Sequence, residues 1–291
     1  MANEEIKRIV MGLRPIDDDF MNIIFSENTP LVEYVLQVIL DKSDLVIEES
    51  KTQVKTNHFG SLNVTFDVLA KDNTGKRYNI EVQRSSAGAD TRRARYHSAS
   101  IDVDSLSSGQ TFKELLDSYV IFITEKDVLK GQEPIYHINR SIAETTEIFD
   151  DGAHIIYVNA SYQNVQTSLG KLIHDFMCSQ SSDMLCEPIA KVTYKYKNTP
   201  EGVDYMCKAV EEYGLKREKE GIQKGRQEGR REGRQEGRRE GRQEGRREGR
   251  QEGIIESVIK FIKKGKLSYE EIADNFDMPV DEVRKLAAQT L

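Results

Sequence analysis

The chain has 291 residues, of which 31% are charged and 37% are hydrophobic, and its formal net charge is −7. That charge is unevenly placed, with −9 on residues 1–224, +3 on residues 225–253 and −1 on residues 254–291. An acidic body argues against broad electrostatic capture of nucleic acid, so such binding would need a local basic patch and a metal ion. The sequence has no apolar run near the ~20 residues that span a bilayer, no signal-peptide pattern and no C-x-x-C spacing. We therefore expect a cytoplasmic protein without a membrane partner, a disulfide framework or a cysteine zinc site.

The first 57 residues predict two helices followed by strands. Residues 14–25 carry acids in the first turn and an apolar side, which predicts a short helix entered through Pro15. Thr29 and Pro30 predict the N-cap and first turn of a second helix, which is apolar nearly all round and therefore buried. Residues 44–57 alternate between apolar and polar side chains and predict one or two strands.

A β-hairpin is predicted for residues 61–83, where two alternating runs flank the turn sequence DNTG. The predicted apolar face, which should pack on a core, consists of Val64, Phe66, Val68, Ala70, Tyr78, Ile80 and Val82. The predicted polar face consists of Thr65, Asp67, Leu69, Asn79, Glu81 and Gln83.

The length of the hairpin loop decides whether the polar face forms a site. A three-residue loop at 73–75 puts Asp67 directly opposite Glu81, with Cβ atoms roughly 5 Å apart. Two carboxylates that close repel unless a cation or a proton lies between them, and Mg²⁺ is bound through one or two carboxylates. A two-residue loop would instead put Asp67 opposite Ile80. The alternative to a site is the ordinary wet face of an antiparallel sheet, where such residues are expected without function.

An arginine-rich segment follows the hairpin, and residues 90–105 predict a helix. On that helix Arg92 lies one turn before Arg95 and Tyr96, so one face presents guanidinium and phenol groups together. Arg84 precedes the helix. Arginine suits phosphate because its planar fork binds two oxygens, so these residues are candidate phosphate contacts. The alternative is a solvated helix face with ordinary surface arginines.

The rest of the chain predicts further strands and helices. Strands are expected at 118–124, 134–139 and 154–159, a helix within 165–178, and a long helical stretch from 204. The tail, 254–291, predicts three short helices, the second opened by a capping box of Ser268 and Glu271. This arrangement resembles a helix-turn-helix unit, but a net charge of −1 makes it a poor duplex binder, which favours a docking role.

Residues 221–253 have glycine at every fourth position, and GRQEGRRE occurs three times in tandem. Each glycine costs a helix ~1 kcal/mol relative to alanine, and arginines at i, i+4 repel. A glycine stripe nevertheless lets two helices approach closely. Two interpretations stay open, namely a self-associating helix that makes the chain a homo-oligomer and a flexible charged linker.

These motifs together resemble the PD-(D/E)xK nuclease-like transposases, also called Rpn-type recombination-promoting nucleases. The resemblance rests on DDDFMNIIF at 17–25, FDV at 66–68, IEVQ at 80–83, RYHS at 95–98, VIFI at 120–123, MCKAVEEYG at 206–214, the glycine repeat and LSYEEIADNF at 267–276. It implies an α/β fold with a restriction-endonuclease-like αβββαβ core in residues 1–215. It further implies a charged glycine-repeat segment, helical or linker, at 216–253 and a small helix-turn-helix-like module at 254–291.

The resemblance implies a DNA endonuclease that hydrolyses phosphodiester bonds with Mg²⁺ or Mn²⁺, in recombination or mobile-element biology. The implied catalytic residues are Asp67, Glu81 and Gln83, and the implied metal ligands are Asp67, Glu81, the Val82 backbone carbonyl and Asp17. Arg95, Tyr96 and His97 would contact phosphate, beside the candidate contacts Arg84 and Arg92. Gln83 stands where the superfamily motif has lysine, so it can orient an attacking water by hydrogen bonds but supplies no positive charge.

Two other functions compete with the nuclease. One is a DNA-binding or scaffold protein that kept the fold and lost turnover, with Gln83 as the trace of that loss. The other is an assembly protein whose function lies in the repeat and the tail. Plasmid cleavage with and without Mg²⁺ separates the nuclease from the DNA-binding or scaffold protein. Truncation near Glu220 tests the assembly function.

Overall fold

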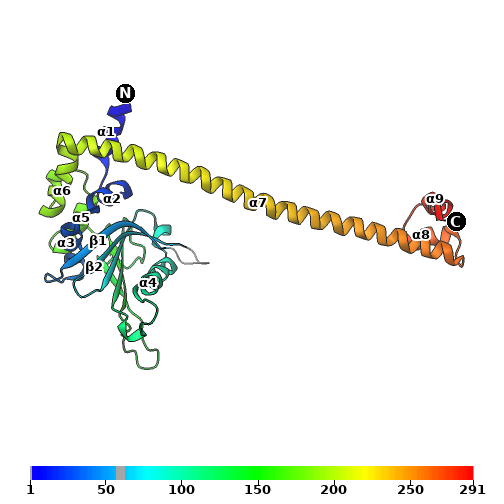
Figure 1. The fold of residues 1–291 in the computed structure, drawn as a ribbon, viewed down its shortest axis with the longest axis horizontal. Helices are drawn as coiled ribbons and strands as arrows, with labels where there is room; N and C mark the ends of the chain where they lie inside the picture. The colour runs from blue at the N-terminus through cyan, green and yellow to red at the C-terminus, as the bar shows by residue number, and fades with distance from the viewer. Residues whose placement is uncertain (1, 57–62, 291) are drawn as a thin grey trace. The chain divides into compact units, whose positions relative to one another are not determined.

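Six strands form one mixed sheet in the computed structural model, which describes residues 2–56 and 63–290 (Figure 1). Residue 57, at the end of the first predicted strand region, and residues 61–62, at the start of the predicted hairpin, lie outside the described residues. The strands are β1 (Ile47–Lys55), β2 (Thr65–Asp72), β3 (Arg77–Gln83), β4 (Ser118–Thr124), β5 (Ile135–Ile138) and β6 (Ala153–Asn159). Their order is β1-β2-β3-β4-β6-β5, with β3, β4 and β6 parallel and the other neighbours antiparallel.

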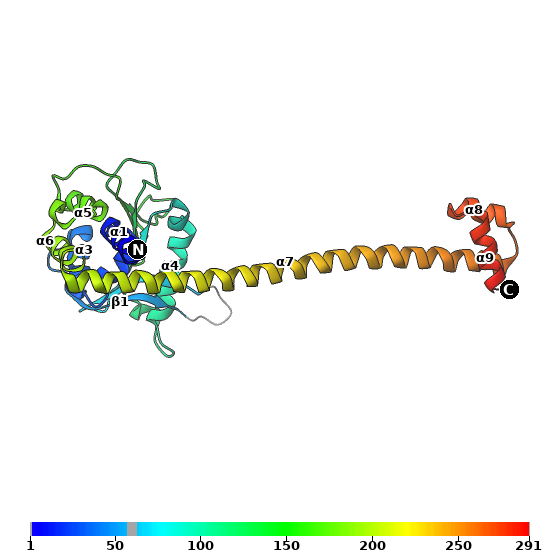
Figure 2. The same ribbon diagram turned by 90° about the horizontal axis from the view of Figure 1, so that it is seen from above.

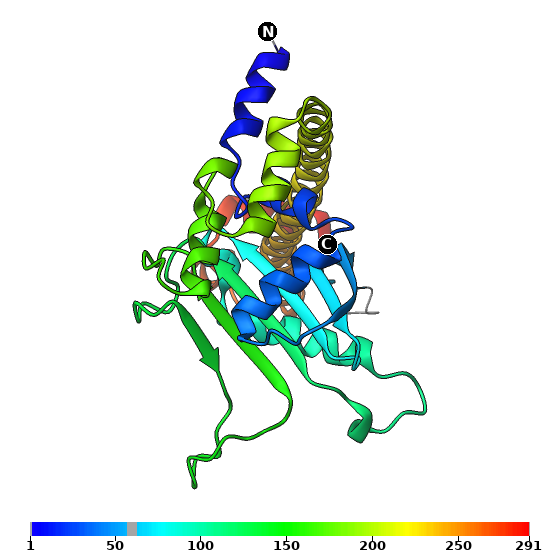
Figure 3. The same cartoon turned by 90° about the vertical axis from the view of Figure 1, so that its left-hand side faces the viewer.

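Helices lie on both faces of this sheet (Figure 3). They are α1 (Ala2–Gly12), α2 (Asp18–Phe25), α3 (Thr29–Leu40), α4 (Thr91–Ser105), α5 (Ser168–Met177), α6 (Glu187–Asn198), α7 (Pro200–Lys264), α8 (Tyr269–Phe276) and α9 (Val280–Thr290). One core joins the sheet to α2, α3, α5, α6 and the start of α7, and a second core joins the opposite face to α4. The succession α3-β1-β2-β3-α4-β4 is the expected αβββαβ order, so the α/β prediction is confirmed.

The chain divides into two compact units, Met1–Leu215 and Lys216–Leu291. In the second unit, the end of α7 packs with α8 and α9 around a small core of Val258, Ile262, Ile272, Ala273, Val283 and Ala287. Ser268 and Glu271 form the predicted capping box at the start of α8. Within residues 2–56 and 63–290, no single helix is long and apolar enough to cross a membrane, and α2 with α3 reach that length only together, across a bend of 111°.

The first residues of α2 and α3 differ from those predicted, although both helices lie where they were expected. α2 begins at Asp18, because residues 14–17 form a turn in which the Asp17 N–H donates to the Arg14 carbonyl, and Pro15 therefore precedes the helix. The N-cap of α3 is Asn28, whose side chain accepts the Leu31 N–H, and Thr29 is already helical. The sequence analysis did not predict α1 or α6.

The pleat of β2 changes phase at Asp67, so the predicted apolar face is not continuous. Val64 and Phe66 belong to the core beneath α4, whereas Val68 and Ala70 belong to the core on the other face. The neighbouring residue on β1 is Gln53, which has a φ of +53° in the middle of a strand. A non-glycine residue rarely adopts this left-handed conformation, and the local twist it introduces accounts for the change of face.

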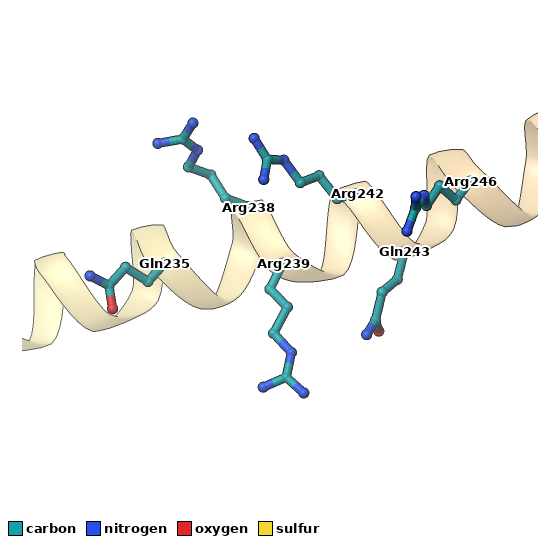
Figure 4. Close-up of a pocket in the computed structure, with 6 residues that line it drawn as sticks. All are labelled: Gln235, Arg238, Arg239, Arg242, Gln243 and Arg246. Atoms are coloured by element: carbon teal, nitrogen blue, oxygen red, sulfur yellow. The ribbon is translucent and has the colours of Figure 1, made fainter.

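The glycine repeat lies within α7, which is one continuous helix from Pro200 to Lys264 (Figure 2). Arg238 and Arg242 point to one side of this helix, and Arg239 and Gln243 point to the other (Figure 4). The hollows between these side chains are gaps on an exposed helix surface rather than enclosed cavities.

We predict that the repeat is helical only when it pairs with another copy or with the rest of the protein. The reason is its low intrinsic helix propensity, because nine glycines at ~1 kcal/mol each oppose the helix. A peptide of residues 221–253 should therefore gain circular-dichroism helix signal as its concentration rises, in parallel with association in sedimentation runs. A helical signal independent of concentration, from a peptide that sediments as a monomer, would contradict this.

Candidate active site

The hairpin between β2 and β3 has a three-residue loop, which is the loop length that puts Asp67 opposite Glu81. The Asp72 N–H donates to the Lys76 carbonyl at 3.1 Å, and Gly75 closes the turn with a φ of +93°. Val68 pairs with Ile80 on the antiparallel strands β2 and β3. The residue before Val68, Asp67, therefore lies opposite the residue after Ile80, Glu81.

The backbone ladder between β2 and β3 gives way to side-chain hydrogen bonds at Asp67. The Asp67 N–H donates to Glu81 Oε1, and the Val82 N–H donates to Asp67 Oδ2, both at 3.1 Å. The N–H and C=O of one strand residue point toward the same neighbouring strand, so the Val82 carbonyl also faces β2 beside Asp67. The two carboxylates therefore meet where the strands separate, with the Val82 carbonyl on the same side of β3.

The carboxylates of this pair destabilise each other. Glu81 is fully buried, and Asp67 is partly buried. Burial, and after it the charge of Glu81, raises the pKa of Asp67 to about 7, and the hydrogen bond from the Val82 N–H offsets part of this rise. A divalent cation between the carboxylates would relieve the repulsion, and oxygen donors are the ligands that Mg²⁺ and Mn²⁺ prefer. The donor set thus fits the metal that the sequence predicted.

Gln53 and Asn22 support Asp67 from β1 and α2. The side-chain amide of Gln53 donates to Asp67 Oδ1 at 3.3 Å and to Asn22 Oδ1 at 2.8 Å. The charge of Asp18, at the start of α2, also raises the pKa of Asp67. These three residues were not predicted from the sequence, because no local pattern connects them to the hairpin.

Two residues on the inner face of α4 hold Glu81. The Arg93 guanidinium lies 3.1 Å from Glu81 Oε2, and His97 Nδ1 lies 3.4 Å from Oε1. The side chain of His97 is buried against Glu81 and Phe66, and its predicted contact with phosphate stays a prediction. The sequence analysis did not select Arg93, although it lies one helical turn before His97 and next to the buried Ala94.

The outer face of α4 carries the other predicted phosphate contacts. Arg92, Arg95 and Tyr96 are exposed, and the structure does not bring them to the acidic pair. They remain predictions for contact with a substrate that extends beyond the site.

Asn79 and Arg93 contact the two ring nitrogens of His97. As placed, Asn79 Nδ2 lies 3.1 Å from His97 Nδ1, and Arg93 Nε lies 3.3 Å from His97 Nε2. A neutral imidazole cannot accept at both nitrogens, and the buried Asn79 Oδ1 has no hydrogen-bond partner in the part of the chain that is described. Turning the Asn79 amide by a half rotation lets Asn79 Oδ1 accept from His97 Nδ1–H while His97 Nε2 accepts from Arg93.

Asp17 belongs to a separate ion-pair cluster. Its carboxylate lies 3.2 Å from both Arg14 and Arg84, and Glu125 contacts the same two arginines at 3.0 Å and 3.3 Å. Asp17 does not form a three-residue ligand group with Asp67 and Glu81 among the described residues. The structure gives Asp17 two arginine partners and ties Arg84 to two carboxylates, and the metal role of Asp17 stays a prediction.

Gln83 lies at the end of β3 beside a glycine. A Cβ added to Gly88 would collide with Gln83 Oε1, so the glycine leaves room for the Gln83 amide. The Gln83 carbonyl accepts the Glu125 N–H at 3.0 Å, which joins the ends of β3 and β4.

One other cluster has metal-binding residue types. His174, Asp175 and Cys178 are the one group of three among the residues described that could hold an ion. Asp175 is fully buried, and its carboxylate oxygens accept the N–H groups of Leu185 and Cys186. These hydrogen bonds give Asp175 a structural role that needs no metal ion. The Cys178 sulfur lies 3.5 Å and 3.7 Å from the two nitrogens of His174, which places it over the ring rather than along either lone pair. Burial also raises the pKa of the Cys178 thiol, which disfavours the thiolate that a metal requires.

Comparison with known proteins identifies the family. The PD-(D/E)XK nuclease family transposase matches residues 21–170, which is more than half of the chain and includes the whole hairpin and α4. Searches of curated proteins and of solved structures found no match. The matched region carries the acidic pair on the second and third strands of the αβββαβ core. The chain therefore belongs to the PD-(D/E)XK nuclease family transposases.

Proposed function

We propose that the protein is a metal-dependent DNA endonuclease that acts in recombination or mobile-element biology. The observation that supports this most strongly is the opposition of Asp67 and Glu81 where the β2–β3 hairpin opens. Two carboxylates in that arrangement repel each other in the metal-free protein. A divalent cation removes this repulsion, so the site is built for occupation by one.

Each residue of the site has a proposed role. Asp67, Glu81 and the Val82 carbonyl would hold Mg²⁺ or Mn²⁺, which supplies a bound water of lowered pKa and offsets charge at the phosphate. Gln83 would orient the attacking water by hydrogen bonding. The exposed face of α4, with Arg92, Arg95 and Tyr96, would contact the DNA backbone together with Arg84, because such contacts position a duplex without reading its sequence.

The remaining proposals concern organisation. Residues 1–215 would be the nuclease domain, 216–253 a repeat that pairs copies of the chain, and 254–291 a docking module. We place the protein in the cytoplasm, with DNA as its partner. These proposals rest on the sequence and on the family.

Cleavage of supercoiled plasmid DNA tests the proposed function. Purified protein should convert supercoiled plasmid to nicked or linear DNA in Mg²⁺ or Mn²⁺, and EDTA should stop the reaction. DNA binding without metal-dependent cleavage would instead support the competing function, a catalytically weak DNA-binding or assembly protein that retains the fold. Gln83 favours that alternative because it leaves the motif without lysine.

Gln83→Ala should slow cleavage by about tenfold, because it removes one neutral hydrogen bond worth roughly 1 kcal/mol. The fold should survive, since the Gln83 side chain is only partly buried. Initial rates of nicking at saturating Mg²⁺, with a thermal melt of the variant beside them, measure this. A rate equal to that of the parent protein would remove Gln83 from the catalytic set.

A further inference from the structure

The proposed hairpin site has two acidic side chains and no basic side chain of its own. Asp67 and Glu81 are carboxylic acids, and Gln83, which stands in the lysine position, is neutral. Hydrolysis of a phosphodiester adds negative charge to the reacting phosphate, and fixed positive charge at that point lowers the barrier. A positive side chain from another element would therefore complete the site.

Arg93 reaches the acidic pair from α4. Its guanidinium lies 3.1 Å from Glu81 Oε2, and its Nε lies 3.3 Å from His97 Nε2. These two contacts fix the direction of the guanidinium, yet 39% of the Arg93 side chain is exposed, whereas Glu81 is fully buried. An arginine carries five N–H donors, so donors remain for a phosphate that approaches from solvent.

The other nearby arginines are placed differently. Arg14 and Arg84 are bound by the carboxylates of Asp17 and Glu125. Arg92 is exposed on the outer face of α4. The charge of Arg93 also acts on Asp67, whose pKa it lowers, so this arginine influences both members of the acidic pair.

We propose that Arg93 is a catalytic residue that supplies the fixed positive charge of the site, in place of the lysine missing at position 83. It holds Glu81 before the substrate binds and contacts the reacting phosphate afterwards. A guanidinium stays protonated in proteins, so Arg93 acts through charge and hydrogen bonds and transfers no proton. This inference rests on the proposed nuclease function.

Relocation of the charge tests the inference. Arg93→Met should slow plasmid cleavage in Mg²⁺ by about 100-fold or more, the loss typical of one preorganised donor at developing charge. Arg93→Met combined with Gln83→Lys should recover at least about tenfold of that rate, because the lysine restores a charge at the site. Arg140→Met, which breaks an arginine–aspartate pair outside the site, is the matched control and should leave the rate unchanged.

Mn²⁺ binding, measured by titration calorimetry without DNA, separates catalysis from structure. The Arg93 guanidinium competes with a metal ion for Glu81. Arg93→Met should therefore bind Mn²⁺ at least as tightly as the parent protein does. A purely structural role would weaken Mn²⁺ binding and cleavage together and would prevent rescue by Gln83→Lys, and that result would overturn the inference. If Arg93→Met does not fold, Arg93→Lys replaces it: cleavage within about tenfold of the parent supports the inference, and complete loss overturns it.

The two proposals fail in different ways. A parent protein without metal-dependent cleavage overturns the nuclease function and this inference with it. An active parent, an inactive Asp67→Asn variant and an Arg93→Met variant within threefold of the parent would overturn the role of Arg93 alone.

Discussion

Asp67→Asn should lower metal-dependent DNA cleavage by about 10²–10⁴ while raising the thermal stability of the metal-free protein. Cleavage falls because the substitution removes one of two anionic ligands for the cation. Stability rises because the repulsion with the buried Glu81 disappears, and the asparagine oxygen can still accept the Val82 N–H. A residue that costs stability and is needed for activity is typical of a functional site.

Three measurements on one preparation check this prediction. They are the nicking rate in Mg²⁺, the melting temperature in EDTA, and the change in melting temperature when Mn²⁺ is added. We expect Mn²⁺ to raise the melting temperature of the parent protein and to leave that of Asp67→Asn almost unchanged. Asp150→Asn, on an exposed loop, is the matched control and should behave as the parent. Equal nicking by the parent and Asp67→Asn would show that the site is assigned to the wrong residues.

Lys197→Met should destabilise the first unit by about 2–4 kcal/mol at neutral pH. Lys197 is a buried cation on α6, and its ammonium donates to the carbonyls of Met11, Leu13 and Ser179. It also lies 4.8 Å from the centre of the Phe20 ring. Methionine fills similar space but leaves all three partly buried carbonyls without this donor. The lysine thus ties the chain before α2 to the segment after α5.

The pH dependence of stability gives a second check on Lys197. Burial lowers the pKa of Lys197 to about 8, from 10.5 when exposed. Between these two pH values the unfolded chain binds a proton that the folded protein has released, so this group makes the free energy of unfolding rise with pH. Urea denaturation at pH 7 and pH 10 should show that rise in the parent protein and lose it in Lys197→Met.

The control for Lys197 is another lysine of α6. Lys191→Met removes an exposed i, i+4 pair with Glu187 and should change stability by less than about 0.5 kcal/mol. If Lys197→Met and Lys191→Met had the same free energy of unfolding at both pH values, the Lys197 ammonium would not stabilise the first unit.

Most of the fold could be predicted from local patterns. The alternation on both sides of DNTG predicted the hairpin, and the apolar run 118–124 coincides with β4. The register depended on the loop length, which alternation alone leaves open. The helix predicted at 90–105 coincides with α4, and its N-cap is Asp90, whose side chain accepts the Arg92 N–H. Such features depend on neighbours within a few residues, which is why a single sequence indicates them.

The parts of the site that were missed depend on tertiary contacts. The choice between Arg92 and Arg93 requires knowing which side of α4 packs on the sheet, and four arginines in twelve residues do not reveal it. The ion-pair cluster around Asp17 includes Arg84, which follows β3, and Glu125, which follows β4, and both are far from Asp17 in sequence. The phase change at Asp67 follows from the backbone of Gln53 on another strand. Side-chain direction in these cases is decided by contacts between elements far apart in sequence.

The most direct test of the account is the position of Mn²⁺ in crystals of the full chain. Anomalous diffraction should give a peak that lies within about 2.0–2.3 Å of carboxylate oxygens from both Asp67 and Glu81. We predict that this peak disappears in crystals of Asp67→Asn grown under the same conditions. A protein that binds Mn²⁺ elsewhere, for example at His174 and Asp175, with no peak between Asp67 and Glu81, would contradict the assignment of the metal site to the hairpin.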